Sequence, residues 1–260
     1  MEFKALEFKV YIPARYGSTR LPGKALADLG GAPIIAHVVR RAQESGATLV
    51  VVATDDERIA EAVLPLGAAV AMTSPDHPSG TDRLAEAVAL RGEPGEALIV
   101  NLQGDEPEMP GAVIRQVAAL LAAGEAEIAT VCEPFAVGVS PRDPHVVKVV
   151  RDGRGYALYF SRAPIPWLRA VSPERFANRP GEPAIFFRHV GLYAYRVATL
   201  RAFAALPPVP LEQGEALEQL RALHHGMRIR VGEAVAATGI GIDTPADLEA
   251  ARQRLLGLSG

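Results

Sequence analysis

Residues 48–53 read TLVVVA, an almost unbroken run of apolar side chains. Such a run predicts a strand buried on both faces, as in a parallel sheet that helices cover on each side. Two other segments have the same character, Phe8–Pro13 (FKVYIP) and Ala97–Leu102 (ALIVNL). In Pro33–Glu44, between the first two strands, apolar residues recur at the spacing of one helix face. This alternation predicts an α/β fold with a mostly parallel, doubly wound sheet.

The rest of the first half continues the alternation. We expect a helix capped by Thr54-Asp55 and ending near Leu64, a strand at Ala69–Met72, helices at Thr81–Leu90 and Pro110–Ala123, and a strand at Ile128–Cys132. The ligands of open α/β sheets bind beyond the carboxyl ends of the strands. The residues that follow Pro13, Ala53 and Leu102 are therefore the first places to look for a site.

The pattern changes after Pro134. We expect a hairpin of strands Val146–Arg151 and Tyr156–Ser161, a surface loop at Leu168–Pro183, a strand region at Ala184–Tyr195, a helix at Glu215–His225, a strand at Ile229–Val235 and a last helix beginning at Asp243-Thr244-Pro245. Residues 1–260 therefore form one domain, in which 134–195 contain a smaller β-containing lobe that covers the site or forms a dimer.

Composition excludes several classes of protein. An apolar fraction of 49% excludes wholesale disorder, and a net charge of −3 argues against a dedicated nucleic-acid binder. Cys132 is the single cysteine, so a disulfide within the chain and a cysteine-rich metal site are excluded. We interpret it as a small buried hydrophobe. The sequence contains no signal peptide and no run of apolar residues long enough to span a membrane, so a cytoplasmic location is expected.

The segment after the first strand, Pro13–Lys24, reads PARYGSTRLPGK. It carries three cations, Arg15, Arg20 and Lys24, with glycines and hydroxyl residues between them, Thr19 included. Arginine forks, a lysine point charge and glycine backbone are the groups that hold phosphates. The alternative is an ordinary solvated basic loop. The segment has neither the Walker pattern nor the dinucleotide fingerprint G-x-G-x-x-G, which argues against a dinucleotide dehydrogenase.

Two aspartates are candidate metal ligands. Asp105 follows the buried strand ALIVNL, in the segment NLQGDEP, and a carboxylate at a strand end suits Mg²⁺, which prefers one or two carboxylates together with substrate phosphates. A turn aspartate that caps the next helix is an equal alternative. Asp243 lies in GIGIDTP, where a helix cap is the simpler interpretation. Together with Asp105, however, it completes a pair of carboxylates, and one residue can serve both roles.

These segments together resemble the CMP-Kdo synthetases, the 3-deoxy-manno-octulosonate cytidylyltransferases. The resemblance extends from Ile12 to about Arg252. It includes IPARYGSTRLPGK, ATDD at 53–56, PSGTDRLAEA at 78–87, VNLQGDEP at 100–107, VKVVRD at 147–152, ALYFSRAPIPW at 157–167, RHVGLYAYR at 188–196, LEQLR at 217–221 and GIDTPADLE at 241–249. The opening segment also suits sialic-acid cytidylyltransferases, whereas LQGDEP, YFSRAPIPW and RHVGLYAYR are more specific.

The resemblance implies a GT-A-like nucleotidyltransferase fold, a homodimer, and activation of the sugar acid Kdo by CTP for lipopolysaccharide synthesis. It implies catalytic roles for Arg15, Lys24, Asp105 and Asp243. It assigns nucleotide binding to Arg15, Arg20, Lys24 and Arg83, and Mg²⁺ binding to Asp105 and Asp243. It assigns the sugar acid to Gln103, Arg162, His189, Tyr193 and Glu218. No side chain is an obvious general base, so we expect the metal ion to activate the sugar hydroxyl.

Three alternatives stay open at this point. A cytidylyltransferase for another sugar acid, such as sialic acid or 8-amino-Kdo, would share the loop and the aspartates. A metal-dependent glycosyltransferase would share the fold but would use a DxD-type pair, and the segment GDEP has no second aspartate at that spacing. A module that only binds nucleotide predicts loss of the loop cations or of the carboxylates, and all five are present.

Overall fold

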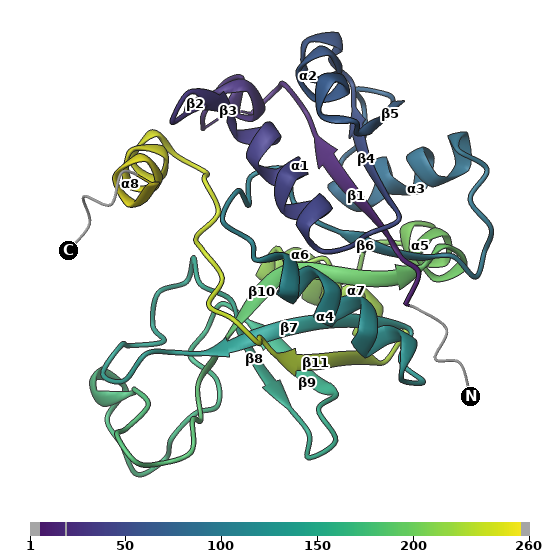
Figure 1. Ribbon diagram of the computed structural model, residues 1–260. Coiled ribbons are helices and arrows are strands. Elements are labelled where there is room, and N and C mark those ends of the chain that lie inside the picture. Colours follow the sequence, from purple (N-terminus) through teal and green to yellow (C-terminus); the bar gives the residue numbers. More distant parts are fainter. Residues whose placement is uncertain (1–5, 19, 256–260) are drawn as a thin grey trace.

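The fold is built on one large sheet whose strands run in the order β11-β7-β10-β6-β1-β4-β5 (Figure 1). The computed structural model describes residues 6–18 and 20–255. Within these residues the sheet has nine strands, of which seven lie on this path: β1 (Lys9–Ala14), β4 (Leu49–Thr54), β5 (Ala69–Met72), β6 (Leu98–Asn101), β7 (Ile128–Pro134), β10 (Phe187–Arg196) and β11 (Ile229–Glu233). Neighbours pair in parallel except around β10, which is antiparallel to both β6 and β7. The predicted mostly parallel α/β sheet is confirmed.

Helices cover both faces of this sheet. They are α1 (Ile34–Glu44), α2 (Glu57–Val63), α3 (Gly80–Leu90), α4 (Gly111–Ala122), α5 (Val197–Ala204), α6 (Pro210–Glu215), α7 (Gln219–His224) and α8 (Pro245–Leu255). Strand β1 shows how the two cores arise: Val10 and Ile12 pack into the core of α1, α2 and α4, whereas Tyr11 faces the core of α3, α5 and α7. Successive side chains of a strand point to opposite faces, so an unbroken apolar run fills both cores.

Two helix boundaries differ from the prediction. The side chain of Asp56, rather than Thr54-Asp55, caps α2, because its carboxylate accepts the backbone N–H of Arg58. The helix expected over Glu215–His225 begins later, as α7 at Gln219, because an earlier helix, α6, ends at Glu215 and Ala216 follows it at φ +50°. The guanidinium of Arg162 binds the carbonyls of Glu215 and Ala216, which are therefore not available to continue a helix.

A smaller lobe projects from the sheet between β7 and β10 (Figure 1, lower left). It contains the hairpin of β8 (Lys148–Arg151) and β9 (Ala157–Ser161), which the turn signal predicted, and a loop with one short 3-10 turn, η3 (Pro173–Arg175). Its own apolar cluster is formed by Phe135, Phe176 and Phe186. Residues 187–195 of the predicted lobe belong to β10 in the central sheet, so the separate part ends near Phe186.

Cys132 is fully buried in β7, and burial raises the pKa of its thiol to about 11, as expected for a cysteine that serves as a small hydrophobe. Among the helices of the described residues, none is both long enough and apolar enough to cross a membrane.

Candidate active site

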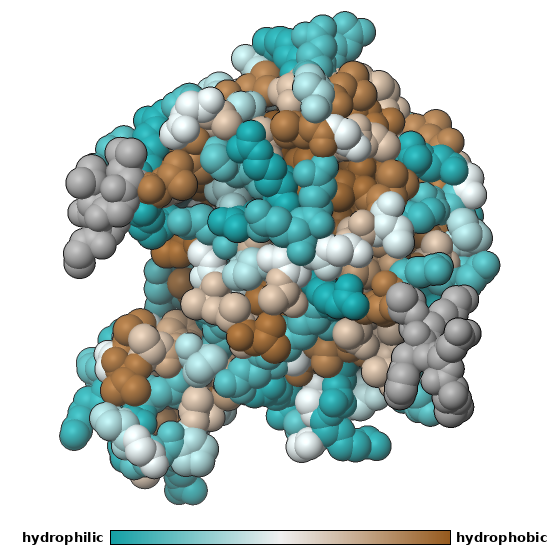
Figure 2. Space-filling view, in the orientation of Figure 1, coloured by the Kyte–Doolittle hydropathy of each residue, from teal (hydrophilic) through white to brown (hydrophobic). Residues whose placement is uncertain are grey.

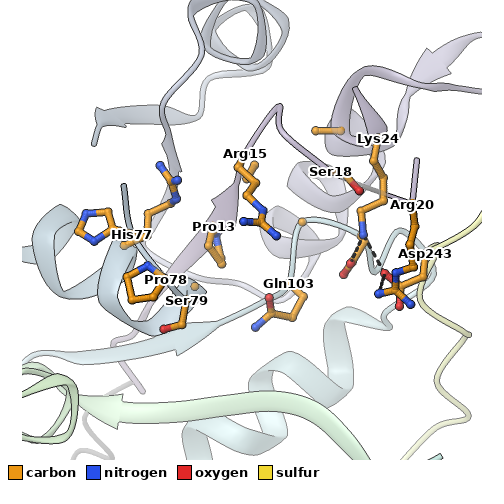
Figure 3. A pocket seen from close by; sticks show the side chains of 16 residues that line it. Pro13, Arg15, Ser18, Arg20, Lys24, His77, Pro78, Ser79, Gln103 and Asp243 are labelled. Carbon is orange, nitrogen blue, oxygen red and sulfur yellow. Dashed lines mark hydrogen bonds and ion pairs between the residues drawn. The ribbon is translucent and has the colours of Figure 1, made fainter. Parts of the chain in front are cut away.

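A cavity of about 310 Å³ opens at the carboxyl ends of β1 and β6, where the sheet topology predicts a site. Its lining brings together segments far apart in the sequence (Figure 3). The lining residues are Pro13, Ala14, Arg15, Ser18, Arg20, Lys24, Ala25, His77, Pro78, Ser79, Gly80, Arg83, Gln103, Gly104, Asp105 and Asp243. Four arginine or lysine residues and two aspartates therefore share one small space, as an anionic ligand with a metal ion requires.

The basic loop forms one side of this cavity. Its last turn begins at Gly23, whose φ of +67° suits glycine, and a Cβ there would meet the Tyr16 ring at 3.2 Å. Tyr16 is in turn covered by the Arg58 guanidinium, 3.6 Å from the ring centroid. This packing places Lys24 at the start of the short helix η1 (Lys24–Leu26). Thr19 lies outside the described residues.

Lys24 joins the two candidate metal ligands. Its ammonium donates to Asp105 at 2.5 Å and to Asp243 at 3.1 Å, and the same oxygen of Asp243 lies 3.0 Å from the Arg20 guanidinium (Figure 3). Burial opposes the charge of the Lys24 ammonium, but the two carboxylates outweigh it and raise its pKa. Two carboxylates separated by 138 residues of sequence therefore converge on one cation.

The structure also decides the role of Asp243 at the last helix. Thr244 and Asp247 cap α8 reciprocally: the Asp247 carboxylate accepts the backbone N–H groups of Asp243 and Thr244, and the Thr244 hydroxyl accepts the N–H of Asp247. The Asp243 side chain is not used for the cap and points to Lys24. The helix-cap alternative for its carboxylate is wrong, because its neighbour performs that role.

Asp105 is placed by a close approach of two backbones. A Cβ on Gly104 would lie 2.8 Å from the carbonyl oxygen of Pro13, a distance that side chains do not tolerate. The glycine therefore lets the loop after β6 lie against the end of β1. The residue after Asp105, Glu106, was not among the predicted site residues: burial, with Asp105 adding to the effect, raises its pKa to about 7.

The donor set fits a divalent cation of the Mg²⁺ kind. Asp105 and Asp243 already hold a positive charge between them, in the form of the Lys24 ammonium. No group of three or more histidine, cysteine or acidic side chains arranged for a metal occurs within residues 6–18 and 20–255. Mg²⁺ takes one or two protein carboxylates and completes its shell with substrate phosphates and water, so a pair of carboxylates beside a basic loop suits it.

Arg83 lies on the opposite side of the cavity and is almost fully buried. Its guanidinium donates to the Thr73 hydroxyl at 2.6 Å and to Asp55 at 3.0 Å. The second oxygen of Asp55 is buried without a hydrogen-bond partner among the described residues. Ser79 caps α3, because its hydroxyl accepts the backbone N–H of Asp82. Asp55, which we expected to cap α2, instead fixes Arg83.

The predicted sugar-binding residues form a strip that leads away from the cavity. Gln103 lines the cavity and donates to Asn101, whose partner across the sheet is Tyr193. The rings of Tyr193 and His189 are 5.4 Å apart. Glu218 reaches the strip from the other side, because its carboxylate accepts hydrogen bonds from Ser79 at 3.0 Å, from Thr81 at 2.6 Å and from Arg221 at 2.7 Å.

Burial sets the ionisation of this strip. Burial, assisted by the neighbouring Arg188, lowers the pKa of His189 to about 3, so its imidazole is neutral. One ring nitrogen lies 3.0 Å from the hydroxyl of Thr130. Burial also raises the pKa of Tyr193 and of Glu218, although the hydrogen bonds to Glu218 act in the opposite direction. The strip therefore offers neutral donors beside one acidic acceptor.

Arg162 lies apart from the other predicted sugar residues. Its guanidinium donates to the carbonyls of Pro144, Glu215 and Ala216, and its backbone N–H donates to the Glu215 carboxylate. It is absent from the described lining of the cavity. In this structure Arg162 joins the smaller lobe to the break between α6 and α7, and its contact with a sugar acid stays a prediction.

Comparison with known proteins shows the family of the chain. A sequence model of the family described as cytidylyltransferase matches residues 10–229. The chain is 53% identical over 252 residues to the 3-deoxy-manno-octulosonate cytidylyltransferase of Nitrosococcus oceani (96% of this chain, 97% of the relative) and 55% identical over 260 residues to that of Alkalilimnicola ehrlichii (97% of each). The chain belongs to the 3-deoxy-manno-octulosonate cytidylyltransferase family.

A solved structure of a CMP:2-keto-3-deoxy-manno-octonic acid synthetase complexed with CTP superposes on the chain with a TM-score of 0.85. It is 42% identical, and the match covers 97% of this chain and 99% of the other. The predicted family, enzyme class and nucleotidyltransferase fold are thus confirmed. Our sequence reasoning missed the role of Asp55 as the partner of Arg83, because the two residues lie in different segments and only the folded chain brings them together.

Proposed function

We propose that this protein transfers the CMP group of CTP to 3-deoxy-D-manno-octulosonate (Kdo) and releases pyrophosphate. The observation that carries the proposal is the meeting of the basic loop with Asp105 and Asp243 in one cavity, joined by Lys24 at 2.5 and 3.1 Å. A glycosyltransferase donor has a diphosphate, whereas three loop cations suit the triphosphate of CTP. The names of the relatives and the CTP complex of the solved structure support the same substrates.

The loop cations would hold the phosphates of CTP. Arg15 and Arg20 are exposed at the cavity and present guanidinium forks, which suit phosphate oxygens. Lys24 is mostly buried, and its raised pKa keeps it positively charged at neutral pH. As the bond to the leaving group breaks, these three cations would stabilise the negative charge that develops on pyrophosphate.

Asp105 and Asp243 would hold Mg²⁺ through their carboxylates. When bound there, the ion would withdraw charge from the α-phosphate and lower the pKa of the attacking hydroxyl. Lys24 and Arg20 neutralise the remaining charge of the pair, which keeps two close carboxylates ionised together. In this proposal the three loop cations bind the phosphates and the two aspartates bind Mg²⁺.

Arg83 would contact the nucleoside. Thr73 and Asp55 hold two of its nitrogens, so its orientation is set before any ligand binds. Ser79 and Gly80, at the start of α3, line the same side of the cavity. A guanidinium of fixed orientation, beside the backbone of Ser79 and Gly80, suits recognition of a base and its ribose.

The strip formed by Gln103, His189, Tyr193 and Glu218 would hold the sugar acid. The amide of Gln103 and the hydroxyl of Tyr193 are donors for the sugar carboxylate, and the raised pKa of Tyr193 keeps that hydroxyl protonated. Glu218 is an acceptor for sugar hydroxyls. The anomeric C2 oxygen of Kdo would then form a bond to the α-phosphorus, the bond between this phosphorus and the oxygen bridging to the β-phosphate would break, and the hydroxyl proton would pass to solvent.

The homodimer belongs to the same proposal. Several large apolar side chains of the smaller lobe are exposed, namely Val137, Val139, Leu158, Trp167 and Ile185. Figure 2 shows hydrophobic surface on this lobe, at the lower left. Exposed apolar patches of this kind mark interaction sites, and a second copy is the partner we propose. Because CTP is a cytoplasmic metabolite, we place the reaction in the cytoplasm, as an early step of lipopolysaccharide synthesis.

Pyrophosphate release tests the proposal. The protein is incubated with Mg²⁺, CTP and Kdo, and in parallel with N-acetylneuraminate or 8-amino-Kdo as acceptor and with UTP, ATP or GTP as donor. Release that requires both CTP and Kdo is expected. Release with CTP and another sugar acid would support the second candidate, a cytidylyltransferase of different acceptor specificity, and would overturn the roles given to Gln103 and Tyr193. No release from folded protein would contradict the proposal.

A further inference from the structure

Asp243 lies near the end of an irregular segment, residues 234–244, which we name the β11–α8 connection. This segment contains no helix or strand, yet it carries one of the two carboxylates of the site. Metal-ligating side chains must be held within a fraction of an ångström of their productive positions. The connection must therefore be fixed by contacts with its neighbours.

Two of its residues, Thr238 and Ile242, are buried and serve as anchors. The backbone N–H of Ile242 donates to the carbonyl of Asp105 at 2.9 Å, which ties the two carboxylate-bearing segments together. Gly239 and Gly241 permit this contact, because a Cβ on Gly239 would lie 2.4 Å from the Cβ of Glu108. The connection thus follows the loop of Asp105 closely.

An ion pair fixes the other anchor. Arg188 in β10 and Glu133 in β7 lie opposite each other, and the guanidinium donates two hydrogen bonds to the carboxylate, at 2.8 and 2.5 Å. The same pair engages every hydrogen-bonding group of Thr238. The Thr238 N–H donates to Glu133 at 2.5 Å, and its hydroxyl and carbonyl accept from Arg188 at 2.7 and 3.1 Å. We call Arg188, Glu133 and Thr238 the clamp.

Its geometry argues that the clamp acts on the connection rather than on the sheet. Strands β7 and β10 are already paired by backbone hydrogen bonds along most of their length, so they need no ion pair to stay together. Replacing a largely buried ion pair by apolar residues is often neutral for stability, so such a pair is weak evidence for a stabilising role. What the pair supplies here is a set of directed bonds to one residue, five positions before Asp243.

We infer that Arg188 and Glu133 are positioning residues: by holding Thr238 they set the path of the β11–α8 connection, and so the separation of Asp243 from Asp105 that cation binding requires. The inference rests on the proposed function, because it takes these two aspartates as the metal ligands. Outer residues that orient metal ligands typically contribute 10- to 100-fold to metal affinity. The clamp reaches its ligand through the backbone and belongs to this class.

The test compares metal binding in clamp variants with that of the wild type. Arg188→Met removes the donors to Thr238. The double variant Arg188→Met with Glu133→Leu also removes the carboxylate that the single variant leaves unpaired, so it keeps the experiment valid if the single variant does not fold. The matched control is Glu93→Gln, which breaks another buried ion pair, with Lys9, at the opposite end of β1.

Three quantities are measured: the dissociation constant for Mn²⁺ by electron paramagnetic resonance of the free ion, the Mg²⁺ concentration that half-saturates pyrophosphate release, and the melting temperature. We expect the folded clamp variants to bind Mn²⁺ about 10-fold or more weakly. They should need correspondingly more Mg²⁺ and recover most of kcat at saturating Mg²⁺, whereas Glu93→Gln should lose melting temperature alone.

Mn²⁺ affinity within twofold of the wild type in the folded double variant would overturn the inference. Asp243→Asn, measured in the same way, separates the two possible failures. Weak Mn²⁺ binding by Asp243→Asn beside unchanged binding by the clamp variants overturns the clamp and leaves the proposed function standing. Unchanged binding by Asp243→Asn overturns both the metal assignment and the clamp.

Discussion

The side of the cavity that we propose for the phosphates (the phosphate side) carries two exposed arginines beside the mostly buried Lys24, whereas the side that we propose for the nucleoside (the nucleoside side) carries a buried arginine whose partners are already in place. Arg15 and Arg20 are exposed, and the side chain of Arg20 is 63% accessible. Arg83 is only 3% accessible and is held by Thr73 and Asp55. We therefore expect the two exposed arginines to contribute binding energy when a charged ligand arrives, whereas Arg83 is oriented during folding.

The two carboxylates lie on the phosphate side, beside Lys24 and Arg20, and there we expect the largest effect. Asp105→Asn removes a charge that both Lys24 and the metal ion need, so kcat should fall about 10³-fold with little change in folding. Pyrophosphate release at saturating CTP, Kdo and Mg²⁺ measures the fall, and circular dichroism verifies the fold. Near-normal turnover with Mg²⁺ would contradict the role of Asp105 in metal binding.

On the nucleoside side, Asp55→Asn should reduce both stability and CTP binding. It leaves the buried Arg83 charge without its counterion, and breaking a buried pair in this way costs about 3 kcal/mol of unfolding free energy. Urea denaturation measures the loss. The matched control is Glu57→Gln, an exposed carboxylate two residues later, which should change stability by less than about 0.5 kcal/mol. Equal losses of unfolding free energy in the two variants would show that the buried charge of Arg83 does not need Asp55 as its counterion.

On the phosphate side, Arg15→Ala should impair CTP binding and leave stability unchanged. A charge-assisted hydrogen bond contributes about 1.5–3 kcal/mol, so KM for CTP should rise about 10- to 100-fold. Because Arg15 is exposed, the unfolding free energy should change by less than about 0.5 kcal/mol. Arg40→Ala, which removes an exposed arginine of α1, is the control for KM. Loss of stability in Arg15→Ala would remove the contrast between the two sides.

The strip formed by Gln103, His189, Tyr193 and Glu218 should be ordered during folding, as Arg83 is. A small dependence of the unfolding free energy on pH tests this. Burial lowers the pKa of His189 from its ordinary value of 6.5 to about 3, so the unfolded chain binds a proton between these values that the folded chain does not. Stability is therefore complete above pH 6.5 and falls as the pH is lowered towards 3. Urea midpoints at pH 7 and pH 5 should differ less in His189→Asn than in the wild type. The exposed His145→Asn should retain the wild-type difference.

The sequence predicted most helices and strands, because apolar side chains are the ones that become buried and their spacing along the chain follows the type of element. The runs TLVVVA and ALIVNL became central strands, and the turn at 152–155 became a hairpin. Predictions that depend on which of several polar side chains takes a partner were less successful. Asp55 was expected to cap α2, but Asp56 does so, because Arg83 from another helix binds the Asp55 carboxylate.

Sequence alone therefore predicted the fold class and the basic loop at the end of β1, because these features depend on residue type and local spacing. It left Asp105 and Asp243 each with two interpretations, a metal ligand or a helix cap. Only the tertiary structure decided that β10 runs antiparallel between β6 and β7, that Thr244 and Asp247 cap α8, and that the pair of Arg188 and Glu133 holds the β11–α8 connection. The physical reason is that hydrogen bonds between distant segments compete for the same groups, and only the folded chain shows which bond forms.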